Sequence, residues 1–171
     1  ASLISVCVIQ NSLVFLIVWE VMALASFFLV IFEHYKHITL KAGINYLIQS
    51  HVVVLFLTIA FIWVYFRQGS YDFKAIRAFA ASEPIFDSLA LLVCFFVGFG
   101  IKAGFVPFHT WLPLAHPAAP SHISGVMSGV LIKAGIYGII RMIFLVHTNL
   151  LVFGYFVLIV SVISGVYGVM L

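Results

Sequence analysis

The sequence predicts an all-α fold, namely a polytopic bundle of transmembrane helices in which one helix is broken. Of the 171 residues, 65% are hydrophobic and only 8% are charged, whereas an ordinary soluble domain has about 25% charged residues. The chain also contains several apolar runs longer than the roughly 18 residues that indicate a membrane-spanning helix. Transmembrane strands are not expected, because they would alternate apolar and polar residues, and these runs are apolar throughout.

The spans follow one another along the chain with short polar breaks between them. Hydropathy places five helical crossings after a short apolar tail, and we expect no signal peptide. The chain does not begin with Met and both of its ends are apolar, so we expect it to be a piece of a longer polytopic protein. The spans are expected near residues 11–32, 42–66, 88–118, 121–146 and 150–171.

Three polar stretches separate these spans, at Glu33–Lys41, at Arg67–Asp87 and at 147–149. Basic residues nearly balance between the two longer stretches, so charge alone does not give the orientation of the chain. Within the second stretch, residues 71–81 have apolar side chains at helical spacing. This pattern indicates either a short helix on the membrane surface or an ordinary solvated loop.

The third span is too long for one straight helix. Its 31 residues would extend about 46 Å, against a hydrocarbon core of about 30 Å. Its second half contains Pro107, Pro113 and Pro117, each of which removes a backbone donor and disfavours helix before it. We therefore expect a break near residues 105–107, either buried in protein or beside a wet cavity. An extramembrane loop is the alternative, although residues 106–120 carry no Asp, Glu, Lys or Arg.

Three spans carry a charged residue near their centre: Glu20 in the first, Lys102 in the third and Lys133 in the fourth. Each costs about 2.5 to 3.5 kcal/mol to place in a membrane, and such residues typically mark ion or proton pathways. A buried ion pair that holds the bundle together is the alternative. Because two lysines cannot both pair with one glutamate, we interpret the three as parts of a proton path in which Glu20 biases whether Lys102 carries its proton.

Histidines are candidate relays between these charges, because imidazole exchanges protons near neutral pH. His122 lies eleven residues before Lys133, about 16 Å along a regular helix and on one face of it, and His51 lies close to the middle of the second span. His109 and His116 border the predicted break, where they would ligate, relay or bond to a carbonyl. For any single histidine, a satisfied core residue is the alternative. Haem ligation by His51 and His122 has no other support in the sequence.

The remaining composition excludes other functions. A formal charge of +3 with scattered basic residues does not form a nucleic-acid surface. Cys7 and Cys94 lie alone, without a C-x-x-C pair, so no zinc or iron–sulfur site is predicted. No phosphate loop, nucleophile elbow or HExxH motif is present. We therefore expect no metal, no cofactor and no catalytic residue on this chain.

Two stretches carry recognisable motifs. The first is Trp19–Leu24 (WEVMAL), and the second is Gly98–Arg141, which contains IKAGFVPFHTWLPLA and LIKAGIYG. In these motifs, and in their order and separation, the sequence resembles the antiporter-like membrane subunits of respiratory complex I, the Mrp sodium/proton antiporters and the membrane-bound hydrogenases. The stretch HPAAPSHISGVMSG is most similar to the hydrogenase, formate hydrogenlyase-type branch, with complex I second.

The resemblance implies a subunit of roughly fourteen helices built from inverted five-helix repeats. This chain would hold the first repeat and part of the next helix or so. It matches Glu20, Lys102 and Lys133 to the proton-path residues of the family. It would place Glu33–Lys41 in the cytoplasm and Arg67–Asp87 on the other side of the membrane.

From residues and resemblance together, we expect a proton-translocating membrane subunit of a redox-driven complex of the hydrogenase or NADH:quinone oxidoreductase type. Its partners would be the lipid bilayer, protons or Na⁺, and other membrane-arm and redox subunits that hold the redox centres. We expect it in an energy-coupling membrane, the inner membrane of a bacterium or archaeon. The alternatives are a stand-alone Mrp-type Na⁺/H⁺ antiporter subunit and a structural membrane anchor without transport.

Overall fold

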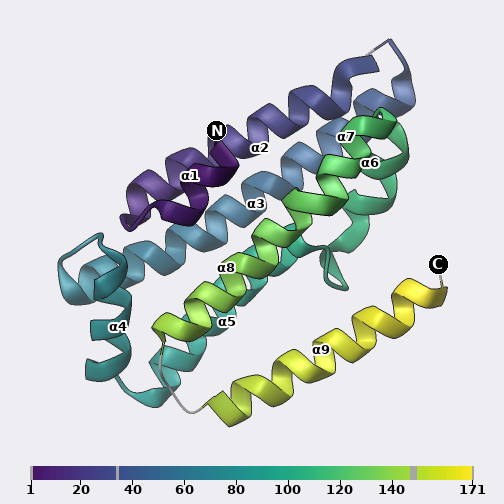
Figure 1. Cartoon of the computed structure of the whole chain (residues 1–171). Helices are drawn as coiled ribbons and strands as arrows, with labels where there is room; N and C mark the ends of the chain where they lie inside the picture. The colour runs from purple at the N-terminus through teal and green to yellow at the C-terminus, as the bar shows by residue number, and fades with distance from the viewer. Residues whose placement is uncertain (1, 34, 147–149, 171) are drawn as a thin grey trace.

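The structure, a computed structural model, describes residues 2–33, 35–146 and 150–170. Within these residues the chain is helical and forms no strand (Figure 1). Five helices are long and apolar enough to cross a membrane, which confirms the predicted polytopic helical bundle. The break predicted at 147–149, with His147, lies outside the described residues, as does His34.

Most of the helices are α-helical, while two short 3₁₀ helices and one π-helical turn are labelled η. In chain order they are α1 (Ser2–Val8), α2 (Ser12–Val30), η1 (Ile31–Glu33), α3 (His37–Gln68), α4 (Phe73–Ser82), α5 (Ile85–Ala103), η2 (Phe108–Trp111), α6 (Leu112–Ala118), α7 (Ser121–Val126), η3 (Met127–Leu131), α8 (Ile132–Leu145) and α9 (Leu150–Met170).

The ends of α2 and α3 follow from their capping residues. Asn11 caps α2, because its side-chain oxygen accepts hydrogen bonds from the backbone N–H groups of Leu13 and Val14. Helix α3 ends at Gln68 and is followed by the capping residue Gly69, which has φ 70° and donates its N–H to Tyr65 O. With 32 residues, α3 is about 48 Å long and extends beyond a hydrocarbon core of about 30 Å.

The third span is broken, as the prolines predicted. Helix α5 ends at Ala103, and Gly104 follows in the left-handed conformation with φ 77°. After an irregular turn the chain forms η2 and then α6, which has Pro113 in its first turn, where a missing N–H costs little. The second half of the span therefore continues in short pieces instead of extending α5.

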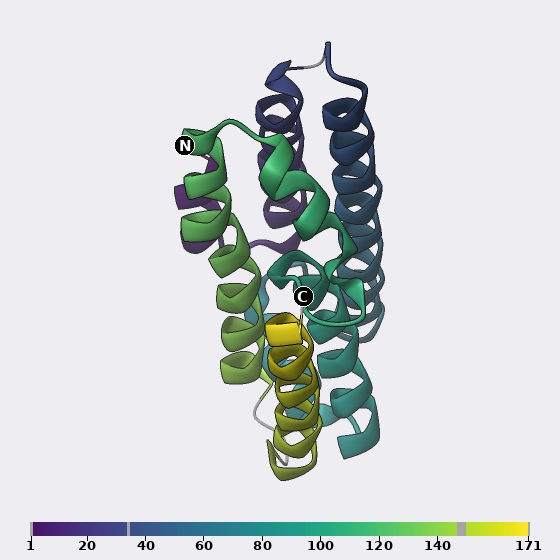
Figure 2. The ribbon, with the colours of Figure 1, turned by 90° about the vertical axis from the view of Figure 1, so that its right-hand side faces the viewer.

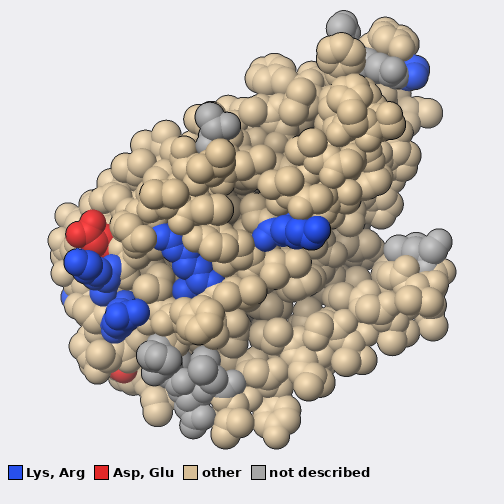
Figure 3. Space-filling model, in the orientation of Figure 1, with Lys and Arg blue, Asp and Glu red and all other residues tan. Residues whose placement is uncertain are grey.

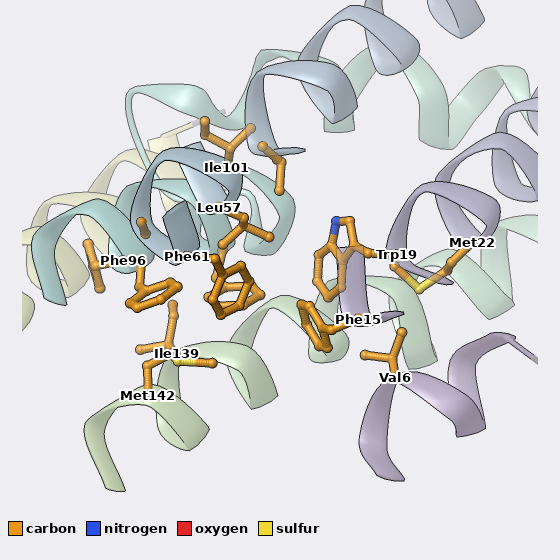
Figure 4. Close-up of a cluster of buried hydrophobic side chains, with 14 of the residues drawn as sticks. Val6, Phe15, Trp19, Met22, Leu57, Phe61, Phe96, Ile101, Ile139 and Met142 are labelled. Carbon is orange, nitrogen blue, oxygen red and sulfur yellow. The ribbon is translucent and has the colours of Figure 1, made fainter. Parts of the chain in front are cut away.

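Helix α5 lies at the centre of the bundle, packed between α3 and α8. Its side chains join a core of buried aromatic and aliphatic residues that includes Phe15, Trp19 and Phe61 from the neighbouring helices (Figure 4). On α8, a Cβ at Gly135 would lie 2.7 Å from the Phe99 carbonyl oxygen. Only glycine therefore allows α5 and α8 to approach this closely.

Residues 73–82 form helix α4, so the solvated-loop interpretation of this stretch was wrong. Helix α4 buries Phe73, Ile76 and Phe79 against the bundle. The link between α1 and α2 pairs with the start of α4, where Phe73 N–H donates to Gln10 O at 2.8 Å. Charged residues on the visible face gather towards the end that holds α4, and most of the remaining surface is uncharged (Figure 3).

Helix α9 stands apart from the other helices (Figures 1 and 2). Most of its described side chains are exposed. Its contacts include Phe153, which packs edge-on against Phe96, and Ser164, whose hydroxyl accepts the Val106 N–H at 3.1 Å. Helix α9 thus touches α5 and the irregular turn that follows it.

Candidate functional site

Lys102 is almost completely buried, with 2% of its surface exposed. Its Nζ donates to the Tyr46 hydroxyl at 2.6 Å and lies 3.5 Å from the Ser50 hydroxyl. The amine also lies 4.4 Å from the centre of the Tyr46 ring and 5.8 Å from that of Trp111. Among the described residues no carboxylate forms an ion pair with it. Hydroxyl groups and aromatic faces therefore replace water around this amine.

The helix break places Lys102 in this environment. Because α5 ends at Ala103, Lys102 stands in its last turn, where the unpaired carbonyl groups of a helix favour a cation. The chain then turns back, and Trp111 donates its Nε1–H to Ile101 O at 2.8 Å. The ring of Trp111 packs edge-on against that of Tyr46, with 5.3 Å between centroids. The break thus folds an aromatic side chain back over the lysine.

Glu20 pairs with His51, not with a lysine. His51 Nε2 lies 3.2 Å from Glu20 Oε1, and His51 Nδ1 lies 2.9 Å from Leu47 O. A carbonyl oxygen only accepts, so Nδ1 carries a hydrogen. The bond to Glu20 then needs one more proton, which lies on Nε2 or on the carboxyl group. This contact links α2 to α3.

Helix α3 contributes to both groups of polar side chains, the one around Lys102 and the Glu20–His51 pair. Ser50, which contacts Lys102, and His51, which contacts Glu20, are consecutive residues. No direct ion pair joins Glu20 to Lys102 among the residues that the structure describes. Any influence of Glu20 on Lys102 therefore passes through α3 or through space.

Lys133 and His122 are exposed on the surface of this chain, and the structure does not bring them to Lys102. The turn η3 lies between them and is π-helical, because Ile132 N–H donates to Met127 O five residues back. Such a turn widens the helix by one residue. The single face predicted for His122 and Lys133 assumed a regular α-helix throughout, and that assumption was wrong across η3.

The residues of the predicted break have structural contacts of their own. His116 is hydrogen-bonded to the Ser124 hydroxyl at 2.7 Å, which connects α6 to α7. His109 packs edge-on against Tyr167 of α9 at 4.9 Å, while its Nδ1 is buried with no partner in the described part of the chain. Pro107 directly precedes η2. No three His, Cys, Asp or Glu side chains of the described residues are arranged to hold a metal ion.

Sequence reasoning missed the partners of Lys102, namely Tyr46, Ser50 and Trp111. The signal for the first two was present, because they are four residues apart and therefore share one face of a helix. Gln49 and Asn45 add amide groups next to that face. Trp111 was hidden by the break, since no helical period predicts where an irregular turn places a side chain.

A family model described as the NADH:quinone oxidoreductase/Mrp antiporter transmembrane family matches residues 10–171. The chain belongs to this family. Hydrogenase-4 component B of Escherichia coli (strain K12) is 42% identical over 173 residues, which cover 99% of this chain and 25% of that protein. NADH-quinone oxidoreductase subunit M of Rickettsia bellii is 30% identical over 159 residues, covering 92% of this chain and 32% of that protein.

A solved structure shares the fold of most of this chain. The membrane-bound sulfane sulfur reductase, an archaeal respiratory membrane complex, contains a chain that matches 85% of this one with a TM-score of 0.73 and 30% identity. The match covers 23% of that chain. This sequence therefore spans about a quarter of the length of hydrogenase-4 component B and of the matching archaeal chain.

Proposed function

We propose that this chain is part of a proton-translocating, antiporter-like membrane subunit of a redox-driven complex. The observation that carries the proposal is the buried amine of Lys102, which has two hydroxyl neighbours and no carboxylate partner among the described residues. A lysine that served only to hold the bundle together would be paired with an acid, because an uncompensated buried charge is costly.

The surroundings of Lys102 suit both of its protonation states. A hydroxyl group both donates and accepts hydrogen bonds. The Tyr46 hydroxyl accepts from the ammonium form at 2.6 Å, and after rotation of its hydrogen it would donate to the neutral amine. Lys102 can therefore lose and regain a proton while keeping its neighbours, which is what a proton carrier requires.

The Glu20–His51 pair supplies a second proton-binding position in the same membrane-embedded region. Moving its proton from Nε2 to Oε1 turns an imidazolium–carboxylate ion pair into a neutral pair, and it does so one residue along α3 from the contact of Ser50 with Lys102. In a medium of low dielectric constant such a change acts strongly on a nearby amine. Glu20 and His51 would thus bias whether Lys102 keeps its proton.

Lys133 and His122 would continue the path beyond this chain. Lys133 stands near the middle of the Ser121–Leu145 span, and its side chain is exposed on this chain. A lysine at that depth does not face lipid in a stable membrane protein but faces protein or water. The remainder of the longer protein would therefore meet Lys133 and carry the proton onwards.

The names of the relatives support a hydrogenase-type or NADH:quinone oxidoreductase-type complex as the host. Electron transfer would take place on other subunits, with no cofactor on this chain. The energy-coupling membrane of a bacterium or archaeon is the proposed location. An Mrp-type Na⁺/H⁺ antiporter and a structural anchor are the competing functions.

The test places Lys102→Ala in the full-length subunit, reconstitutes the parent complex in sealed vesicles, and records proton uptake beside electron transfer. Lys74→Ala is the matched control, because Lys74 is exposed on α4. We expect loss of proton uptake from the assembled Lys102 variant only. Unchanged uptake and turnover would leave the structural anchor as the better account. Replacing Na⁺ by K⁺ separates proton transport from sodium exchange, since proton transport would not respond.

A further inference from the structure

The short helix η2 forms a lid over Lys102. Trp111, the last residue of η2, is buried and packs against Tyr46, and it is fixed by its bond to Ile101 O. Side chains of α3, α5 and η2 line the space around the amine, which is partly open but too narrow to hold a water molecule. With the lid closed, Lys102 therefore exchanges hydrogen bonds with side chains alone.

Two amide side chains of α3 hold this lid. Gln49 Nε2 donates to Thr110 Oγ1, and Asn45 Nδ2 donates to Thr110 O at 3.3 Å. Thr110 directly precedes Trp111 in the chain. Both bonds therefore hold η2 at the residue next to Trp111.

The other end of the Gln49 amide is left without a partner. Gln49 Oε1 is buried and accepts no hydrogen bond from the described residues, and Gln49 lines the same narrow space as Lys102. If the amide is turned over, its nitrogen is unpaired instead. Either arrangement disfavours the closed state, because a buried polar group without a partner lowers stability. A water molecule in an opened site would satisfy it.

We propose that Gln49 and Thr110 are positioning residues that latch η2 over Lys102, and that release of the latch admits water between the Gln49 amide and the lysine amine. This proposal rests on the proton-carrier role of Lys102. In the closed state η2 shields Lys102 from water on its own side of the membrane. In the open state water connects Lys102 with that side. The latch therefore prevents protons from leaking through the site when no electrons flow.

The test measures passive proton leak through the parent complex in sealed vesicles without electron transfer. Thr110→Val removes the hydroxyl and keeps the shape of the side chain, whereas Thr110→Ser keeps the hydroxyl. We expect Thr110→Val to raise the leak about fivefold, which corresponds to a hydrogen bond of about 1 kcal/mol, and Thr110→Ser to stay near wild type. Thr58→Val, on the same helix α3 and away from the site, is the control.

A double variant separates the latch from general damage. Adding Lys102→Met to Thr110→Val is expected to return the leak to the wild-type level, because the leak passes through Lys102. A leak that persists in the double variant would overturn the proposal, as would a Thr110→Val leak equal to wild type. If Lys102→Met alone leaves redox-driven proton uptake intact, the proton-carrier role itself fails. If Lys102→Met abolishes uptake while Thr110→Val leaks no more than wild type, only the latch fails.

Discussion

His51 Nε2 lies 3.2 Å from Glu20 Oε1, which makes a histidine of α3 the partner of the glutamate of α2. The preceding residue, Ser50, lies 3.5 Å from the amine of Lys102. Two consecutive residues of one helix therefore contact the two charged groups of the site. This relationship gives α3 a role in the proposed proton path that the spacing of charges along the sequence did not indicate.

Replacing Glu20 by Gln tests the first proton-binding position. The amide keeps the shape of the side chain but cannot take up a proton. We expect redox-driven proton uptake to fall about tenfold, which corresponds to about 1.4 kcal/mol, because the amide oxygen still accepts the His51 hydrogen bond but brings no negative charge to it. Uptake by the reconstituted complex is the measurement. Glu83→Gln, which lies outside the apolar spans and pairs weakly with Arg67 at 3.8 Å, should pump normally. Equal uptake by Glu20→Gln and wild type would show that the pair is not on the path.

Replacing Tyr46 by Phe tests the hydroxyl that contacts Lys102. The ring and its cation–π contact remain, whereas the 2.6 Å hydrogen bond is lost. A buried ammonium group without this acceptor is destabilised by about 1 to 3 kcal/mol, so proton uptake should fall while the complex still assembles.

The matched variant is Tyr65→Phe on the same helix, because Tyr65 lies against Tyr71 near the end of α3. Its uptake should equal that of wild type. If Tyr46→Phe also pumps at the wild-type rate, the Tyr46 hydroxyl is not needed for proton transfer at Lys102.

The close approach of α5 and α8 predicts a stability effect at Gly135. A methyl group there would lie 2.7 Å from Phe99 O and 2.8 Å from Ala103 N, so backbone must move. We expect Gly135→Ala to destabilise the subunit by about 1 to 3 kcal/mol, as overpacking does. The melting temperature of the purified complex measures this. Gly154→Ala on α9, where nothing lies within 4 Å of the added carbon, serves as the reference. Equal melting temperatures for the Gly135→Ala and Gly154→Ala complexes would refute the packing argument.

Arg141 holds the end of α1 and predicts a difference between arginine and lysine. Its guanidinium group donates to Val6 O at 3.2 Å and to Ile9 O at 2.5 Å, and it lies 4.3 Å from the centre of the Phe73 ring. A lysine keeps the charge but cannot bridge two carbonyl groups with a planar fork.

Arg141→Lys should therefore lower the melting temperature, with a free-energy loss of about 1.5 to 3 kcal/mol from the weakened charged hydrogen bonds. Arg77→Lys on α4, an exposed position, should have no effect. Full stability of Arg141→Lys would mean that charge alone, without the two carbonyl contacts, anchors α1.

Much of the fold could be predicted from the sequence because the membrane simplifies the problem. Apolar runs of sufficient length must form helices there, and the prolines after Lys102 required a break. The path of the chain through the break could not be predicted. It depends on the left-handed conformation of Gly104 and on the hydrogen bond from Trp111 back to Ile101 O. Both are set by tertiary contacts and produce no periodic pattern in the sequence.

The candidate site was likewise predicted only in part. The unusual residues Glu20, Lys102 and Lys133 were visible because a charge in an apolar run is conspicuous, whereas the partners of Lys102 were not. Tyrosine and serine are unremarkable residue types in a helix, and only the tertiary packing shows that Tyr46 and Ser50 face Lys102. The relation of His122 to Lys133 was misjudged because a π-turn leaves no mark in the sequence.

The central claim is that Lys102 releases and regains a proton, and Lys102→Arg tests it most directly. Arginine keeps the positive charge but does not release its proton in proteins. We predict that the reconstituted complex with Lys102→Arg, like that with Lys102→Met, assembles but takes up no protons beyond those consumed by its redox reaction. Proton uptake per electron by the Lys102→Arg complex equal to that of wild type would contradict the account, because a fixed charge would then suffice at this position.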